Sequence, residues 1–136
     1  MNTNGLIEVL EATRLTHYSI ACLVRNAFPQ YRFQILRENE SWCVYERGIW
    51  YVGREAYHSL REGISSELAP FVHGHLAQLI RTSDDEELIA RLQRLELMLL
   101  DAPQKDWIMR ECESIMFLRS VDPIDPVEAS VTSFYI

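Results

Sequence analysis

The residues best suited to chemistry in this 136-residue chain are four histidines, three cysteines and twenty acidic side chains. The densest group is the run Asp84 to Glu87, DDEE, whose carboxylates suggest a cation site. A calcium loop needs alternating oxygen ligands, a central glycine and a final glutamate, and this run lacks all three. His73 and His75 are two residues apart on an expected helix, so they point in different directions. We therefore expect no metal and no cofactor.

Nucleophilic and acid–base chemistry form the second class that these residue types permit. Cys43 and His58 flank the expected sheet and could approach in space, and Glu46, Glu55 and His58 could exchange protons. None of them stands at a spacing that such chemistry demands. The sequence also lacks GxGxxG, GxxxxGK[ST], GxSxG and HExxH. We expect a protein that is not an enzyme and has no catalytic residues.

Residue types common in protein-binding hot spots gather between residues 31 and 54. The rings of Tyr31, Phe33, Trp42, Tyr45, Trp50 and Tyr51 are interleaved with Arg32, Arg37, Arg47 and Arg54. One interpretation is a core with cross-strand aromatic pairs. The other is an exposed face for a partner, since Trp, Tyr and Arg dominate hot spots. Tyr45 and Arg47 are the candidate partner-binding residues that we select from this stretch.

The elements that carry these residues are three short strands. Alternation over 31–37 predicts the first strand, with Tyr31 and Phe33 on one face, and 42–46 and 49–52 predict the next two. Gly48 can take the positive φ of the second turn. The third strand is apolar on both faces, which predicts a central strand or one covered on both sides, with Trp50 buried. Together they predict an antiparallel meander over about 31–53.

Helices are expected both before and after the meander in the sequence. Residues 5–13 and 16–28 precede it, the second capped by Thr16. After it, a helix over 54–62 should stop at Gly63, and Ser65 or Ser66 should cap the next helix, which runs to about residue 81 with Pro70 in its first turn. Ser83 and Glu86 predict a capping box for the helix that follows.

The last predicted helix opens at Pro103 and reaches Leu118, with Trp107 on its apolar face. It should form an antiparallel hairpin with the helix before it and pack on the sheet, although a dimer seam stays open. Residues 121–136, which contain Pro123 and Pro126, predict an extended tail that could pair with a sheet edge. The whole chain, 1–136, is then a single α+β domain: a three-stranded antiparallel meander packed against N-terminal and C-terminal helices.

Charge is uneven along the chain. The net charge is −7, and residues 1–63 contribute none of it, with seven Glu and seven Arg. Residues 64–136 carry thirteen acids and six bases. That half would repel nucleic acid and attract a protein with a basic surface. Solubility alone is the competing explanation. The candidate partner-binding acids are Asp84, Asp85, Glu87, Asp101 and Asp106.

The sequence also predicts a cellular compartment and a class of function. The N-terminus lacks the features of a signal peptide, no stretch could cross a membrane, and three unpaired-looking cysteines favour the cytoplasm. We expect a bacterial protein-binding module that acts as a stoichiometric inhibitor, such as an immunity protein or antitoxin, with no nucleic-acid or membrane partner. The alternatives are a secretion-effector chaperone, which would dimerise, and a phage-type inhibitor of a host nucleic-acid enzyme.

Overall fold

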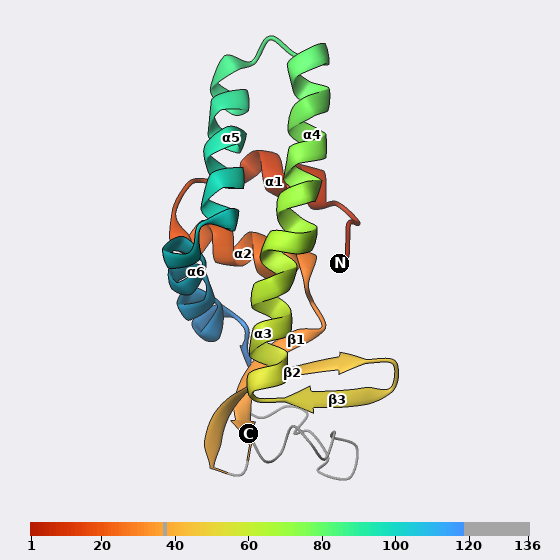
Figure 1. Ribbon diagram of the computed structural model, residues 1–136, viewed down its shortest axis with the longest axis vertical. Coiled ribbons are helices and arrows are strands. Elements are labelled where there is room, and N and C mark those ends of the chain that lie inside the picture. The colour runs from red at the N-terminus through yellow and green to blue at the C-terminus, as the bar shows by residue number, and fades with distance from the viewer. Residues whose placement is uncertain (37, 119–136) are drawn as a thin grey trace.

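The computed structural model describes residues 1–36 and 38–118. A small sheet lies at one end of a body of helices (Figure 1), which confirms the predicted α+β fold. In chain order the elements are α1 (Leu6–Ala12), α2 (His17–Ala27), β1 (Tyr31–Leu36), β2 (Asn39–Glu46), β3 (Ile49–Val52), α3 (Arg54–Gly63), the π-helical turn η1 (Ile64–Leu68), α4 (Ala69–Thr82), α5 (Glu86–Leu100), α6 (Ala102–Ile115) and β4 (Phe117–Leu118).

Strands β1, β2 and β3 form the predicted antiparallel meander. Arg47 and Gly48 join β2 to β3, and both have positive φ, 53° and 79°. A tight two-residue hairpin turn requires this conformation, and Gly48 adopts it without strain. The order among the described strands is β3-β2-β1-β4. The central position predicted for the third strand is therefore wrong, because β3 lies at an edge.

A fourth short strand, β4, pairs in parallel with β1 through Phe33–Phe117 and Gln34–Leu118. The apolar pattern predicts that the last helix reaches Leu118, and this prediction is wrong because α6 ends at Ile115. The N–H of Phe33 donates to the Met116 carbonyl at 3.0 Å, so pairing with the sheet replaces the helical hydrogen bonds at this point. The predicted pairing of the 121–136 tail lies outside the described residues.

The sheet has an inner face that packs on the helices. Tyr31, Phe33, Trp42 and Val44 point this way and are buried in the main core. The Phe33 and Trp42 rings meet edge to face at 5.3 Å between centroids. The hydroxyls of Tyr31 and Ser59 are 2.5 Å apart and tie β1 to α3. The buried-core interpretation of the aromatic stretch is thus correct for these inner rings.

Elements α3, η1 and α4 form one helix without a break, so the predicted stop at Gly63 is wrong. Gly63 has helical φ of −59°. Its role is close packing, because a Cβ there would stand 3.0 and 3.1 Å from ring atoms of Phe28. The predicted cap at Ser65 or Ser66 is also wrong, since both hydroxyls donate to the Glu62 carbonyl. Ala69 separates the widened π turn from Pro70, which has no N–H to give to a helix.

The long antiparallel hairpin of the molecule is formed by α4 and α5 (Figure 1). The hairpin predicted from the sequence joins α5 and α6, and that prediction is wrong. At Asp101 the chain turns, and α6 packs chiefly along α2. A 2.6 Å hydrogen bond between His17 Nε2 and Gln104 Oε1 joins those two helices. Because of this turn, the buried face of α6 is the one that packs on α2 and not the one predicted to pack on α5.

Candidate interaction surfaces

The predicted partner-binding residues lie in three separate places. Asp84, Asp85 and Glu87 are at the α4–α5 connection, at the end of the molecule away from the sheet (Figure 1). Asp101 and Asp106 lie at the start of α6, one α5 length away, about 22 Å for fifteen residues. Tyr45 and Arg47 belong to the β2–β3 hairpin at the other end. The structure does not gather them into one site.

Asp85 has a structural role that the sequence analysis assigns to Ser83. The Asp85 side chain accepts a hydrogen bond from Leu88 N–H at 3.0 Å and is the N-cap of α5. Ser83 Oγ accepts from Asp85 N–H at 3.1 Å, which orients the cap. The predicted capping box of Ser83 and Glu86 is therefore wrong, because the N-cap residue is Asp85, two positions after Ser83.

Asp101 and Asp106 are also engaged within the chain. Asp101 caps α6 by accepting from Gln104 N–H at 3.1 Å. Asp106 receives two hydrogen bonds from the Arg61 guanidinium, at 3.1 and 3.2 Å. The Arg61–Asp106 ion pair is exposed and contributes modestly to stability. Asp101 also lines a hollow in an exposed apolar surface.

That surface, which we name the helical corner, is where α5 gives way to α6. Its residues are Leu97, Met98, Leu100, Asp101, Gln104 and Trp107. Leu97, Leu100 and Trp107 are 67%, 50% and 51% exposed. The first five residues line a shallow hollow of about 480 Å³. Large apolar side chains gathered on a surface often mark a binding site.

Trp107 is held in a fixed orientation although half of it is exposed. His17 stacks on its ring at 6.1 Å between centroids with 13° between the planes. The Arg110 guanidinium lies over the same ring at 4.7 Å. His17 is itself fixed by its hydrogen bond to Gln104. The apolar pattern predicts Trp107 on the buried face of its helix, and the exposure of the ring shows that this prediction is wrong.

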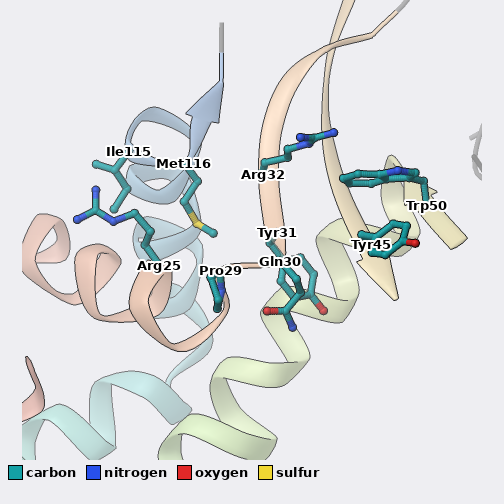
Figure 2. A pocket seen from close by; sticks show the side chains of 9 residues that line it. All are labelled: Arg25, Pro29, Gln30, Tyr31, Arg32, Tyr45, Trp50, Ile115 and Met116. Atoms are coloured by element: carbon teal, nitrogen blue, oxygen red, sulfur yellow. The ribbon is translucent and has the colours of Figure 1, made fainter. Parts of the chain in front are cut away.

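A second surface lies on the other side of the sheet. Figure 2 shows this outer groove between the ends of α2 and α6 and the β2–β3 hairpin. It has a volume of about 490 Å³, within the usual range of ligand sites. Its lining is Arg25, Pro29, Gln30, Tyr31, Arg32, Tyr45, Trp50, Ile115 and Met116. The described residues of this lining include two arginines and no acid, a composition that favours an anionic occupant.

Tyr45 and Trp50 form an aromatic wall of the outer groove, and the Arg32 side chain reaches this wall across Cys43. Tyr45 and Trp50 are a cross-strand pair with ring centroids 5.1 Å apart. The Arg32 guanidinium lies 4.1 Å from the centroid of the Trp50 ring. Arg32 is on β1 and Trp50 on β3, so the side chain must pass over β2, where Cys43 is its register partner. Trp50 is only partly buried, which corrects the expectation of a buried ring.

The candidate catalytic pairs are not assembled. Cys43 points to the outer face, whereas His58 lies on α3 beside Trp42 and Phe33 of the inner face. Burial raises the pKa of the Cys43 thiol to about 12, so it is protonated at neutral pH. Burial likewise raises the pKa of Cys112. A buried, protonated thiol is a poor nucleophile.

Glu46 and Glu55 do share a small cavity of about 190 Å³ with Ser59. The Ser59 hydroxyl is hydrogen-bonded to the phenol of Tyr31. Burial raises the pKa of that phenol, so it stays protonated at neutral pH and does not serve as a base. The histidines pair separately, His75 with Glu11 at 2.7 Å and His73 with Glu96 at 3.1 Å. Within residues 1–36 and 38–118, no three His, Cys, Asp or Glu side chains come together as metal ligands.

Comparisons with known proteins add no assignment. No protein-family model matches the sequence, and no curated protein matches it. Among the described helices none is both long enough and apolar enough to cross a membrane. The functional argument therefore depends on the two surfaces themselves. One sequence feature could have pointed to the helical corner, namely the spacing of Leu97, Leu100 and Trp107 by three and seven residues. The same spacing is also typical of the buried apolar face of a helix.

Proposed function

We propose that this protein is a stoichiometric protein-binding module that neutralises a partner protein, as an immunity protein or antitoxin does. The observation that carries the proposal is the helical corner, where two exposed leucines line a hollow with Gln104, and the exposed Trp107 follows Gln104 by one helical turn. Binding energy in protein interfaces is concentrated in a few such anchors, above all Trp, Tyr and Arg.

Rigidity at Trp107 supports a binding role over simple surface exposure. Ordering a side chain on association costs free energy, and a ring already held by His17 and Arg110 has less freedom left to lose. Arg110, whose guanidinium lies over the ring, is itself a residue type enriched in interfaces. The corner therefore offers a pre-ordered anchor.

Charge supports a partner with a basic surface. The α5 start carries Asp84, Asp85, Glu86 and Glu87, all exposed, and the corner adds Asp101. Acids at the two ends of α5 would accelerate capture of a basic protein without adding much to the final affinity. The proposal places the protein in the cytoplasm, because its three cysteines are free thiols and disulfides persist mainly in oxidising compartments.

The test identifies the partner from the corner itself. A photo-crosslinking amino acid at position 107, in cells that produce the protein natively, should capture one protein in a one-to-one adduct. The same group at Ile80, which is 55% exposed on α4, is the matched control and should capture nothing specific. With the partner purified, Trp107→Ala should weaken binding at least about 10-fold, the effect of losing a hot spot.

Ile80→Ala should bind like the parent, and both variants should keep its melting temperature within a few degrees. Equal crosslinking from positions 80 and 107, or equal affinity of the two variants, would remove the corner as the binding site. If the adduct is a second copy of this chain, the corner is a homodimer seam and the inhibitor proposal is wrong.

A further inference from the structure

Helices α2 and α6 pack along each other, and contacts near both ends of their seam show how the residues match. Near the start, the ring of His17 stacks on the ring of Trp107 with 6.1 Å between centroids. Near the end, Arg25 and Ile115 lie beside each other in the lining of the outer groove (Figure 2). In both pairs the partners are ninety positions apart in the sequence. The two helices therefore run in the same direction and keep one register along the seam.

This register sets Cys22 of α2 against Cys112 of α6. Cys22 follows the first contact by five residues and precedes the second by three, and Cys112 does the same on its own helix. Packed helices have axes about 8–10 Å apart and Cα atoms at a radius of about 2.3 Å, so facing Cα atoms come within roughly 3.5–5.5 Å. A disulfide joins Cα atoms about 4.4–6.8 Å apart, so cysteines at one level of such a seam can be bridged.

Charge and burial agree with this pairing. Burial raises the pKa of the Cys112 thiol most, and negative charge on Cys22 raises that pKa further. Such an effect of a like charge indicates that the two sulfur atoms are near neighbours. Cys112 is fully buried, whereas Cys22 is partly exposed. Cys22 is therefore the thiol that an oxidant reaches first, and Cys112 is the thiol behind it.

We propose that Cys22 and Cys112 are a redox-active pair, which a hydroperoxide oxidises to a disulfide that joins α2 to α6. With hydrogen peroxide, the Cys22 sulfur attacks one oxygen, the O–O bond breaks, and Cys22 becomes a sulfenic acid as one water leaves. The Cys112 sulfur then attacks the Cys22 sulfur. The S–S bond forms, the S–O bond breaks, and the hydroxyl leaves with the Cys112 proton as a second water. The two thiols lose two electrons, and the peroxide gains them.

The disulfide is a reversible lock on the seam. It closes a loop of about ninety residues, and a cross-link over a long loop stabilises a protein mainly by restricting its unfolded chain. Inside cells such bonds are usually transient and redox-sensing, because cellular thiols reduce them again. His17 and Trp107 lie on the two joined helices, so oxidation also secures the stacked pair. The proposal does not depend on the partner proposed for the helical corner.

Peptide mapping tests the pairing in the natural sequence. The reduced protein is treated with hydrogen peroxide, the remaining thiols are blocked with N-ethylmaleimide in denaturant, and the digest is read by mass spectrometry without reductant. We expect peptides linked through Cys22 and Cys112, with the blocking group on Cys43. The oxidised protein should melt at least about 5 °C above the reduced protein, and dithiothreitol should reverse the shift.

Two variants separate the pair from general oxidation. Cys43→Ser should form the linkage like the parent. Cys22→Ser should form none, should keep Cys112 as a thiol, and should melt at the same temperature before and after peroxide. A folded parent protein in which Cys22 becomes sulfinic acid or joins a second chain, with no linkage to Cys112, would overturn the proposal. A linked protein that melts no higher than the reduced one would also overturn it, because the bond would then strain the native seam.

Discussion

Asp85 allows the charge of the acidic run to be separated from its role as a helix cap. Asn caps helices about as well as Asp, whereas Ala does not, and losing a cap costs about 1 kcal/mol. For a protein of this size the entropy of unfolding is about 0.3 kcal/mol/K, so 1 kcal/mol corresponds to roughly 3–4 °C. We expect Asp85→Ala to lower the melting temperature by that amount and Asp85→Asn to stay within about 1 °C of the parent.

Melting curves followed by circular dichroism, at low and high salt, make this comparison. Glu87→Gln is the matched control, because Glu87 lies in the first turn of α5 and makes no capping hydrogen bond there. If Asp85→Asn melts as low as Asp85→Ala, then interaction with the helix dipole and not the Leu88 hydrogen bond provides the stability. With a partner in hand, Asp85→Asn with Glu87→Gln removes two charges and keeps the cap. A slower association confined to low salt would then demonstrate steering.

Three further substitutions test the backbone. Gly74→Ala should stabilise the protein by about 1 kcal/mol, because Gly74 is in α4 and a Cβ there meets nothing within 4 Å. Gly63→Ala should instead destabilise the protein by about 1–2 kcal/mol, because the steric clash of the new Cβ with the buried Phe28 ring outweighs the same gain in helix propensity. Urea unfolding of the two variants measures both effects. Arg47→Asn should raise the free energy of unfolding by about 0.5–1 kcal/mol, because Asn tolerates the left-handed conformation at this turn position better; an unchanged or lower value would contradict this explanation of the turn.

Local patterns were enough to predict much of the fold. The alternation of Tyr31 and Phe33 predicts β1 and its inner face, and Thr16 caps α2 as expected, accepting from Ser19 N–H. Predictions failed where the deciding contact is distant in sequence. Gly63 reads as a helix stop until Phe28, thirty-five residues earlier, is seen against it. Ser83 and Asp85 are both good caps, and sequence rules do not rank two such residues so close together.

The helical corner shows why the candidate binding surface could not be predicted from the sequence. Leu97, Leu100 and Trp107 fit an apolar stripe, and such a stripe is buried if α5 and α6 pack side by side. In the structure the Asp101 cap starts α6 in a new direction, and α2 takes up the buried face of α6. The stripe is then divided: Ile108 and Cys112 pack inward, while Trp107 and the two leucines face solvent. Exposure at the corner is therefore a consequence of the turn at Asp101. The turn leaves three large apolar side chains facing water, and a group of this kind often marks a binding site, which is the observation behind the proposed partner.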